Sequence, residues 1–158
     1  MTPIDVDNEY FNLLNKALSM EIQAIIQYMA QHSKTEMLKM RKKIGALQVI
    51  LGKNKFEVIS DKFKEIALQE MDHAEKIAER IAILGGEPTT KSLPPEVGNK
   101  YNEFLKNNLK AEASAMKFYR EIINEATKRG DIATKKLFED IYMEEEQHYW
   151  TFDEYHED

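Results

Sequence analysis

The sequence predicts an all-α protein built as a four-helix bundle. Apolar residues recur at three- and four-residue steps along almost all of the 158 residues, which is the period of an amphipathic helix. Glycine and proline are scarce, with six and four residues, as suits a chain of long helices. Four long segments of similar length carry this period, so we expect residues 1–158 to form a single bundle domain.

The first helix is expected from about Asn8 to Ser33. Leu14, Leu18 and Ile25 follow one another at helical spacing and mark its core face. The next segment, Thr35 to Leu51, has a less regular pattern, with one glycine inside it and another just after it. We therefore expect a short extra helix there.

The second long helix is expected from about Ser60 to Leu84, with Ile66 and Ile77 on its core face. It should end at Gly85-Gly86, because paired glycines favour a helix C-terminus and a proline lies just beyond them. Residues 89–95 are polar and contain proline, which predicts a connection without regular structure. The residues alone leave open whether this connection is a tight turn or a crossover along the bundle.

The third and fourth helices are separated by a short break. The apolar period predicts the third helix from about Glu96 to Arg129, and Gly130 should end it. Asp131 is expected to cap the fourth helix, which continues to about Glu154.

Composition excludes several classes of protein. The chain has no cysteine, which excludes disulfides, zinc knuckles, iron–sulfur ligation and a thiol nucleophile. A net charge of −6 makes a nucleic-acid partner unexpected. No apolar run approaches the eighteen or more residues of a membrane span, and the first residues lack an export signal, so we expect a cytoplasmic protein.

Carboxylates interrupt the apolar stripe of every helix. Glu21 lies three residues after Leu18 on the first helix, and Glu112 lies three residues after Leu109 on the third. That spacing places both glutamates on the core face. A carboxylate buried without a partner costs several kcal/mol, so each needs a positive charge nearby.

The second and fourth helices each carry a glutamate followed by a histidine at the third position. These pairs are Glu70 with His73 and Glu145 with His148, again on the core stripe. One such pair is common by chance among 28 acidic residues. Two pairs together with two lone core-facing glutamates form the ligand set of di-iron and di-manganese carboxylate bundles.

Four buried glutamates carry four negative charges, which two divalent cations would neutralise. Oxygen-rich ligation with one nitrogen per metal suits iron, with manganese as the alternative, better than structural zinc.

The chain resembles the ferritin-like superfamily, and within it bacterioferritin. The resemblance rests on four segments: Leu14-Asn15-Lys16-Ala17-Leu18 through Glu21, Glu70-Met71-Asp72-His73-Ala74-Glu75, Leu84-Gly85-Gly86-Glu87-Pro88 and Glu144-Glu145-Glu146-Gln147-His148. It implies a ferritin-like four-helix bundle with a long crossover between the second and third long helices.

The resemblance also implies roles for the site residues. These would be Glu21 and His73 on one metal, Glu112 and His148 on the other, and Glu70 and Glu145 bridging the two. Tyr28 matches the family's tyrosine beside the site, where a phenol can hydrogen-bond a ligand or give up an electron. The alternative is an ordinary core tyrosine with its hydroxyl satisfied.

Met71 matches a methionine that ligates a haem shared by two subunits, so the resemblance implies haem b. Ile22, Ile26, Met29 and Leu68 lie on the same outer face, and an apolar face of this size usually marks an interface. We therefore expect a homodimer through the first two long helices. In that case the alternative for Met71 is a dry dimer contact without haem.

Two departures from the family limit the resemblance. Glu21 and Glu70 are 49 residues apart, and if both helices ran on, each would pass the site by roughly 33 Å. An inserted short helix between the first two long helices is expected instead. Ten residues follow His148, too few for the family's fifth helix, so a dimer or a smaller shell is expected in place of the large cage.

The function expected from these residues is that of a ferroxidase, which binds Fe²⁺, oxidises it with O₂ or H₂O₂, and stores or detoxifies iron. One alternative is a rubrerythrin-like peroxidase, which without cysteine would need a separate electron donor. The other is a helical interaction scaffold that binds no metal.

Overall fold

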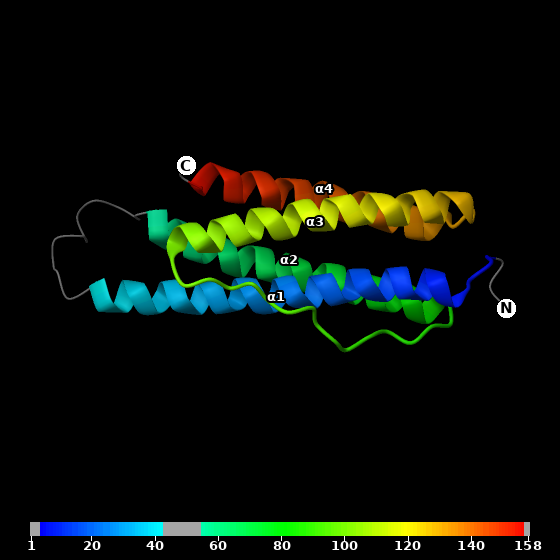
Figure 1. Ribbon diagram of the computed structural model, residues 1–158, viewed down its shortest axis with the longest axis horizontal. Helices are drawn as coiled ribbons and strands as arrows, with labels where there is room; N and C mark the ends of the chain where they lie inside the picture. The colour runs from blue at the N-terminus through cyan, green and yellow to red at the C-terminus, as the bar shows by residue number, and fades with distance from the viewer. Residues whose placement is uncertain (1–3, 43–54, 157–158) are drawn as a thin grey trace.

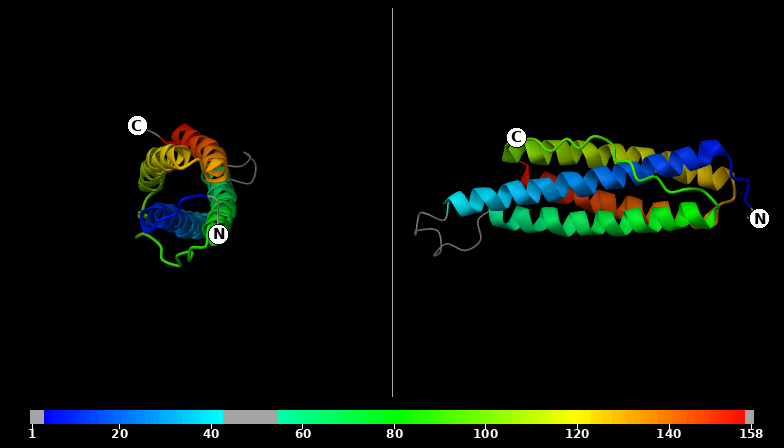
Figure 2. Two further views of the ribbon diagram at one scale, coloured as in Figure 1. Left: turned by 90° about the vertical axis from the view of Figure 1, so that its right-hand side faces the viewer. Right: turned by 90° about the horizontal axis from the view of Figure 1, so that it is seen from below.

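The computed structural model describes residues 4–42 and 55–156, and within these ranges every regular element is an α-helix. The helices are α1 (Asn8–Lys42), α2 (Lys55–Ile83), α3 (Tyr101–Lys128) and α4 (Ile132–Tyr155). They lie side by side along one long axis (Figures 1 and 2). None of the helices in the described ranges is apolar enough over a sufficient length to span a membrane. The predicted all-α bundle is confirmed.

The connection from α2 to α3 runs along the bundle and returns the chain to the opposite end (Figure 1). As a result α2 and α3 point in the same direction, while α1 and α4 point the other way. The predicted long crossover is therefore confirmed. Packing is closest within the two antiparallel hairpins, α1 with α2 and α3 with α4.

Side-chain amides of α1 hold the crossover against the bundle. Three of them donate to crossover carbonyl oxygens: Asn15 to Glu87 at 3.1 Å, Gln23 to Pro94 at 2.9 Å, and Gln31 to Val97 at 3.0 Å. A segment without regular structure leaves its backbone groups unpaired, and these amides supply the missing partners.

Gln31 is fully buried and belongs to a closed polar network. Its Nε2 donates to Asn108 Oδ1 at 2.9 Å, and Asn108 Nδ2 donates back to Gln31 Oε1 at 2.7 Å. The amide of Gln27 also donates to Asn108 Oδ1, at 2.9 Å. The network joins α1, α3 and the crossover.

Replacing Gln31 by alanine is expected to lower the free energy of unfolding by about 2 kcal/mol, because the buried Asn108 amide and the partly buried Val97 carbonyl each lose a hydrogen-bond partner. Chemical denaturation measures the loss. Gln23→Ala is the control, since its bond to Pro94 is exposed and its removal should cost less than about 0.5 kcal/mol. Equal losses in the two variants would contradict the expectation.

The first two helices are longer than predicted. Residues 35–42 continue α1 instead of starting a separate helix, and α2 begins at Lys55 instead of Ser60. The expected short helix is wrong for residues 35–42, and its residues 43–51 lie outside the described residues. No glycine or proline interrupts residues 33–42, and the Thr35 hydroxyl donates to the Gln31 carbonyl at 2.8 Å within the helix. As a result α1 extends roughly 32 Å beyond Glu21.

The third helix begins at Tyr101, five residues later than predicted. Glu96 donates its backbone N–H to Gln27 Oε1 at 2.9 Å, which keeps this residue in the crossover. Gly98 has a φ of +81°, a left-handed conformation that a continuous helix does not allow.

The hydrophobic core is in two parts. Near the N-terminus of α1 it is formed by Tyr10, Leu14, Ala17, Leu18, Ile77, Ile81, Leu84, Ala115, Phe118, Tyr119, Ile122, Ala126, Phe138 and Ile141. Towards the other end it is formed by Tyr28, Ile59, Phe63, Ile66, Ala67, Phe104, Leu105 and Phe152. On all four helices the residues between the two parts are those predicted to bind metal.

Candidate metal centre

Six ionisable side chains from all four helices converge between the two parts of the core. Each is no more than 4% exposed. They are the six expected from the apolar stripes: Glu21, Glu70, His73, Glu112, Glu145 and His148. The structure brings all of them together in one layer across the bundle, which we call the acidic layer.

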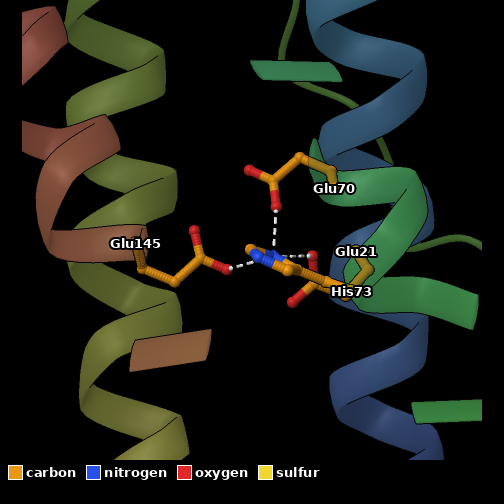
Figure 3. A group of neighbouring side chains, drawn as sticks. All are labelled: Glu21, Glu70, His73 and Glu145. Carbon is orange, nitrogen blue, oxygen red and sulfur yellow. Dashed lines mark hydrogen bonds and ion pairs between the residues drawn. The ribbon is translucent and has the colours of Figure 1, made fainter. Parts of the chain in front are cut away.

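The first half of the acidic layer is centred on His73 (Figure 3). Its Nδ1 lies 2.9 Å from Glu70 Oε2, 3.3 Å from Glu145 Oε1 and 3.5 Å from Glu21 Oε2. Three helices thus point carboxylate oxygens at one imidazole nitrogen.

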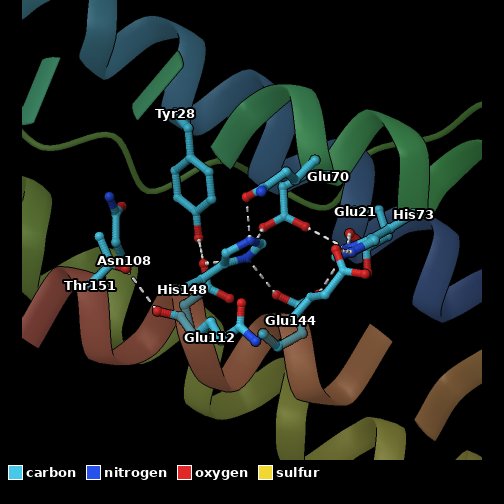
Figure 4. A network of polar contacts seen from close by, with 12 residues as sticks. Glu21, Tyr28, Glu70, His73, Asn108, Glu112, Glu144, His148 and Thr151 are labelled. Atoms are coloured by element: carbon cyan, nitrogen blue, oxygen red, sulfur yellow. Dashed lines mark hydrogen bonds and ion pairs between the residues drawn. The ribbon is translucent and has the colours of Figure 1, made fainter. Parts of the chain in front are cut away.

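The second half is centred on His148 (Figure 4). Its Nδ1 lies 3.2 Å from Glu70 Oε1, 3.2 Å from Glu145 Oε2 and 4.0 Å from Glu112 Oε1. Glu70 and Glu145 contact both histidines, while Glu21 and Glu112 each serve one half.

The donor set fits two divalent cations. Each half offers three carboxylates and one histidine whose ligand atoms lie within 4.8 Å of one another. Glu21 Oε2 and Glu70 Oε1 are buried and accept no hydrogen bond. Buried carboxylate oxygens without a hydrogen bond are costly, and a bound cation would remove that cost.

Burial and mutual repulsion shape the charge state of the acidic layer. Burial, together with nearby Glu145 and Glu70, raises the pKa of Glu21 well above its usual value. The same causes raise the pKa of Glu112. Burial alone would lower the pKa of His148, but the neighbouring carboxylates of Glu145 and Glu70 raise it to about 9. The histidines have the opposite effect on the two shared glutamates, and they lower the pKa of Glu70 and of Glu145.

Two tyrosines hydrogen-bond the carboxylates that serve a single half. Tyr28 Oη donates to Glu112 Oε1 at 2.5 Å, and Tyr119 Oη donates to Glu21 Oε1. Tyr28 was predicted beside the site, whereas Tyr119 was not. The sequence does contain a signal for Tyr119, because each of the two tyrosines lies seven residues after the lone glutamate of its own helix, and therefore on the same face.

The outer nitrogens of the histidines have partners that the sequence did not predict. His73 Nε2 lies 3.1 Å from Glu144 Oε2, and His148 Nε2 lies 2.8 Å from Gln69 Oε1. Glu144 and Gln69 each directly precede one of the shared glutamates. The two hairpins therefore carry the same arrangement of side chains, with this one chemical difference among the contacts described here.

A cavity of about 570 Å³ opens between α1, α3 and the crossover and reaches the acidic layer. All four glutamates of the layer line it, and Lys110, Lys117 and Glu121 are among its other lining residues. The cavity gives small ions and molecules an approach to the carboxylates.

Met71 lies away from the acidic layer. It is 52% exposed on α2, and three other apolar side chains predicted on this face are also exposed: Ile26, Met29 and Leu68. Ile22 is partly buried against the core.

Comparison with known proteins places the chain in a family. The protein-family model described as a ferritin-like domain matches residues 46–158 of the sequence. Bacterioferritin of Desulfovibrio desulfuricans is 35% identical over 86% of this chain and 68% of its own length. Bacterioferritin of Rhodobacter capsulatus is 34% identical over 90% of this chain and 79% of its own length.

Solved structures lead to the same family as the sequence comparison. The R. capsulatus bacterioferritin structure, described with a metal-free dinuclear site and a haem iron, has a TM-score of 0.79 and 31% identity, covering 94% of this chain and 84% of that one. The D. desulfuricans structure, whose diiron site is described in different catalytic states, has the same TM-score and identity, covering 92% and 77%. The resemblance predicted from the sequence is confirmed, and the chain belongs to the bacterioferritin family of ferritin-like proteins.

Proposed function

We propose that the chain is a ferroxidase that binds two Fe²⁺ ions in the acidic layer, oxidises them with O₂ or H₂O₂, and serves iron storage. The observation that carries this is the convergence of two four-residue groups that share two carboxylates. With H₂O₂, two Fe²⁺ ions supply two electrons, and two protons complete its reduction to two waters. Four glutamates balance the charge of two divalent ions.

The residues would divide as their contacts divide. Glu21 and His73 would hold one ion, and Glu112 and His148 the other. Glu70 and Glu145, which contact both histidines, would bridge the two. Tyr28 would hold Glu112 in place and can give up an electron from its phenol. The two parts of the core pack on either side of the layer along the bundle.

Anaerobic titration with Fe²⁺, followed by addition of oxidant, tests the function. We expect saturation near two ions per chain and oxidation of both when H₂O₂ or O₂ is added. A chain that binds no iron saturably would contradict the proposal and would favour the helical scaffold.

Metal binding is expected to release protons and to strengthen as pH rises towards about 9. A metal needs the neutral imidazole of His148, whose pKa is raised to about 9, so protons and cations compete below that value. The heat of Co²⁺ binding, measured by titration calorimetry in buffers of different ionisation enthalpy, gives the number of protons released. An affinity that is constant from pH 6 to 8 would contradict the expectation.

We also propose that two chains pair through α1 and α2, with Met71 at the contact. The exposed apolar side chains on this face support an interface, and one haem shared by two copies of Met71 is the family's arrangement. Size-exclusion chromatography tests the dimer, and a Soret band that disappears in Met71→Ala tests the haem. A monomer in solution would contradict the pairing.

A further inference from the structure

Two residues outside the proposed ligand set hold the outer nitrogens of the histidines. Glu144 on α4 contacts His73 Nε2 at 3.1 Å, and Gln69 on α2 contacts His148 Nε2 at 2.8 Å. Each contact crosses from one hairpin to the other, and Figure 4 labels Glu144 together with His73 and His148.

The partner of His73 is a carboxylate, which has no hydrogen to donate. Nε2 of His73 therefore carries a hydrogen and donates it to Glu144, which leaves Nδ1, on the side of the acidic layer, as the nitrogen that a cation would take. A carboxylate that accepts from the outer nitrogen also makes the imidazole a stronger metal ligand.

The partner of His148 is an amide, which acts differently. An amide that turns by 180° presents a donor in place of an acceptor, so Gln69 does not fix which nitrogen of His148 carries the hydrogen. It is also neutral and makes the imidazole less basic than a carboxylate does. The two halves otherwise match, each with one glutamate of its own, one tyrosine on that glutamate and the same two shared glutamates.

We propose that Glu144 and Gln69 are positioning residues that make the two cation positions unequal, the position of Glu21 and His73 binding a divalent cation more tightly than that of Glu112 and His148. This rests on the proposed function, since it takes the six side chains of the acidic layer as ligands. Exchanging such outer partners typically changes metal affinity by about 10- to 100-fold.

Titration of the metal-free protein with Co²⁺, followed by its absorption bands, tests the proposal without any turnover. We expect two steps, the first about tenfold tighter than the second. Glu144→Gln should weaken the first step about tenfold and merge the two, and Gln69→Glu should strengthen the second.

Variants that keep only one of the two cation positions show which half of the layer responds to each substitution. In Glu112→Ala, the remaining position should be sensitive to Glu144→Gln and insensitive to Gln69→Glu. In Glu21→Ala, the sensitivities should be reversed.

Matched controls separate this effect from a general change of charge. Glu146→Gln and Gln147→Glu make the same chemical changes at exposed positions of α4, and both Co²⁺ steps should keep their affinities. Two equal steps in the unmodified protein, or an effect of Glu146→Gln as large as that of Glu144→Gln, would overturn the proposal. Absence of any saturable Co²⁺ step in the unmodified protein would overturn the proposed function itself.

Discussion

Replacing Glu70 by alanine is expected to remove saturable iron binding at both positions and to lower the ferroxidase rate by at least about 100-fold. The reason is geometric, because Glu70 offers one oxygen to the half centred on His73 and the other to the half centred on His148. Anaerobic Fe²⁺ titration, followed by stopped-flow oxidation, measures both effects.

The matched control is Glu21→Ala. Glu21 belongs to one half only, so this variant should retain about one ion per chain, bound by the half that contains Glu112 and His148. If Glu70→Ala still bound two ions per chain, the acidic layer would not be the iron site.

Replacing Asp131 by alanine is expected to lower the free energy of unfolding by about 3–5 kcal/mol, the usual cost of breaking a buried ion pair. Asp131 is fully buried and caps α4 by accepting from the Thr134 backbone N–H at 3.0 Å. It also accepts from Arg80 Nη2 at 2.7 Å and from Tyr10 Oη at 3.0 Å. Thermal unfolding should show a midpoint about 10 °C lower.

The same carboxylate makes the stability depend on pH. Burial would raise the pKa of Asp131, but hydrogen bonds from Thr134 and the charge of Arg80 hold it below its usual value. Because the folded-state pKa is lowered, this stabilisation is present above pH 4 or so and is lost as pH falls through the folded value. Asp131→Asn keeps the cap and loses the charge, so its effect should be smaller and should vanish in acid.

Much of the fold and the position of the acidic layer could be predicted because charge on an apolar stripe is a local signal. Glu21 and Glu112 each interrupt a stripe that is otherwise apolar, and helical spacing fixes the face on which they lie. Asp131 was predicted as a cap for the same reason, since the residue before a helix has a preferred chemistry, and its contact with Thr134 confirms it. The roles of the six residues as ligands stay a prediction.

What could not be predicted depends on contacts between distant segments. Glu144 lies on the partly exposed side of α4, and only the packing of α4 against α2 brings it to His73. The start of α3 was misplaced because Glu96 is held in the crossover by Gln27, sixty-nine residues earlier. The end of α1 was misplaced because local propensity gave no clear stop signal before Lys42.

The sharing of the acidic layer between the hairpins has a mechanical consequence. Each four-residue group takes three members from one hairpin and a single carboxylate from the other: Glu145 completes the group of Glu21, and Glu70 completes that of Glu112. An ion at either position would therefore link the two hairpins across the interface between them, where packing is weaker than inside each hairpin. Iron binding would then cross-link the two hairpins and would raise the barrier to their separation.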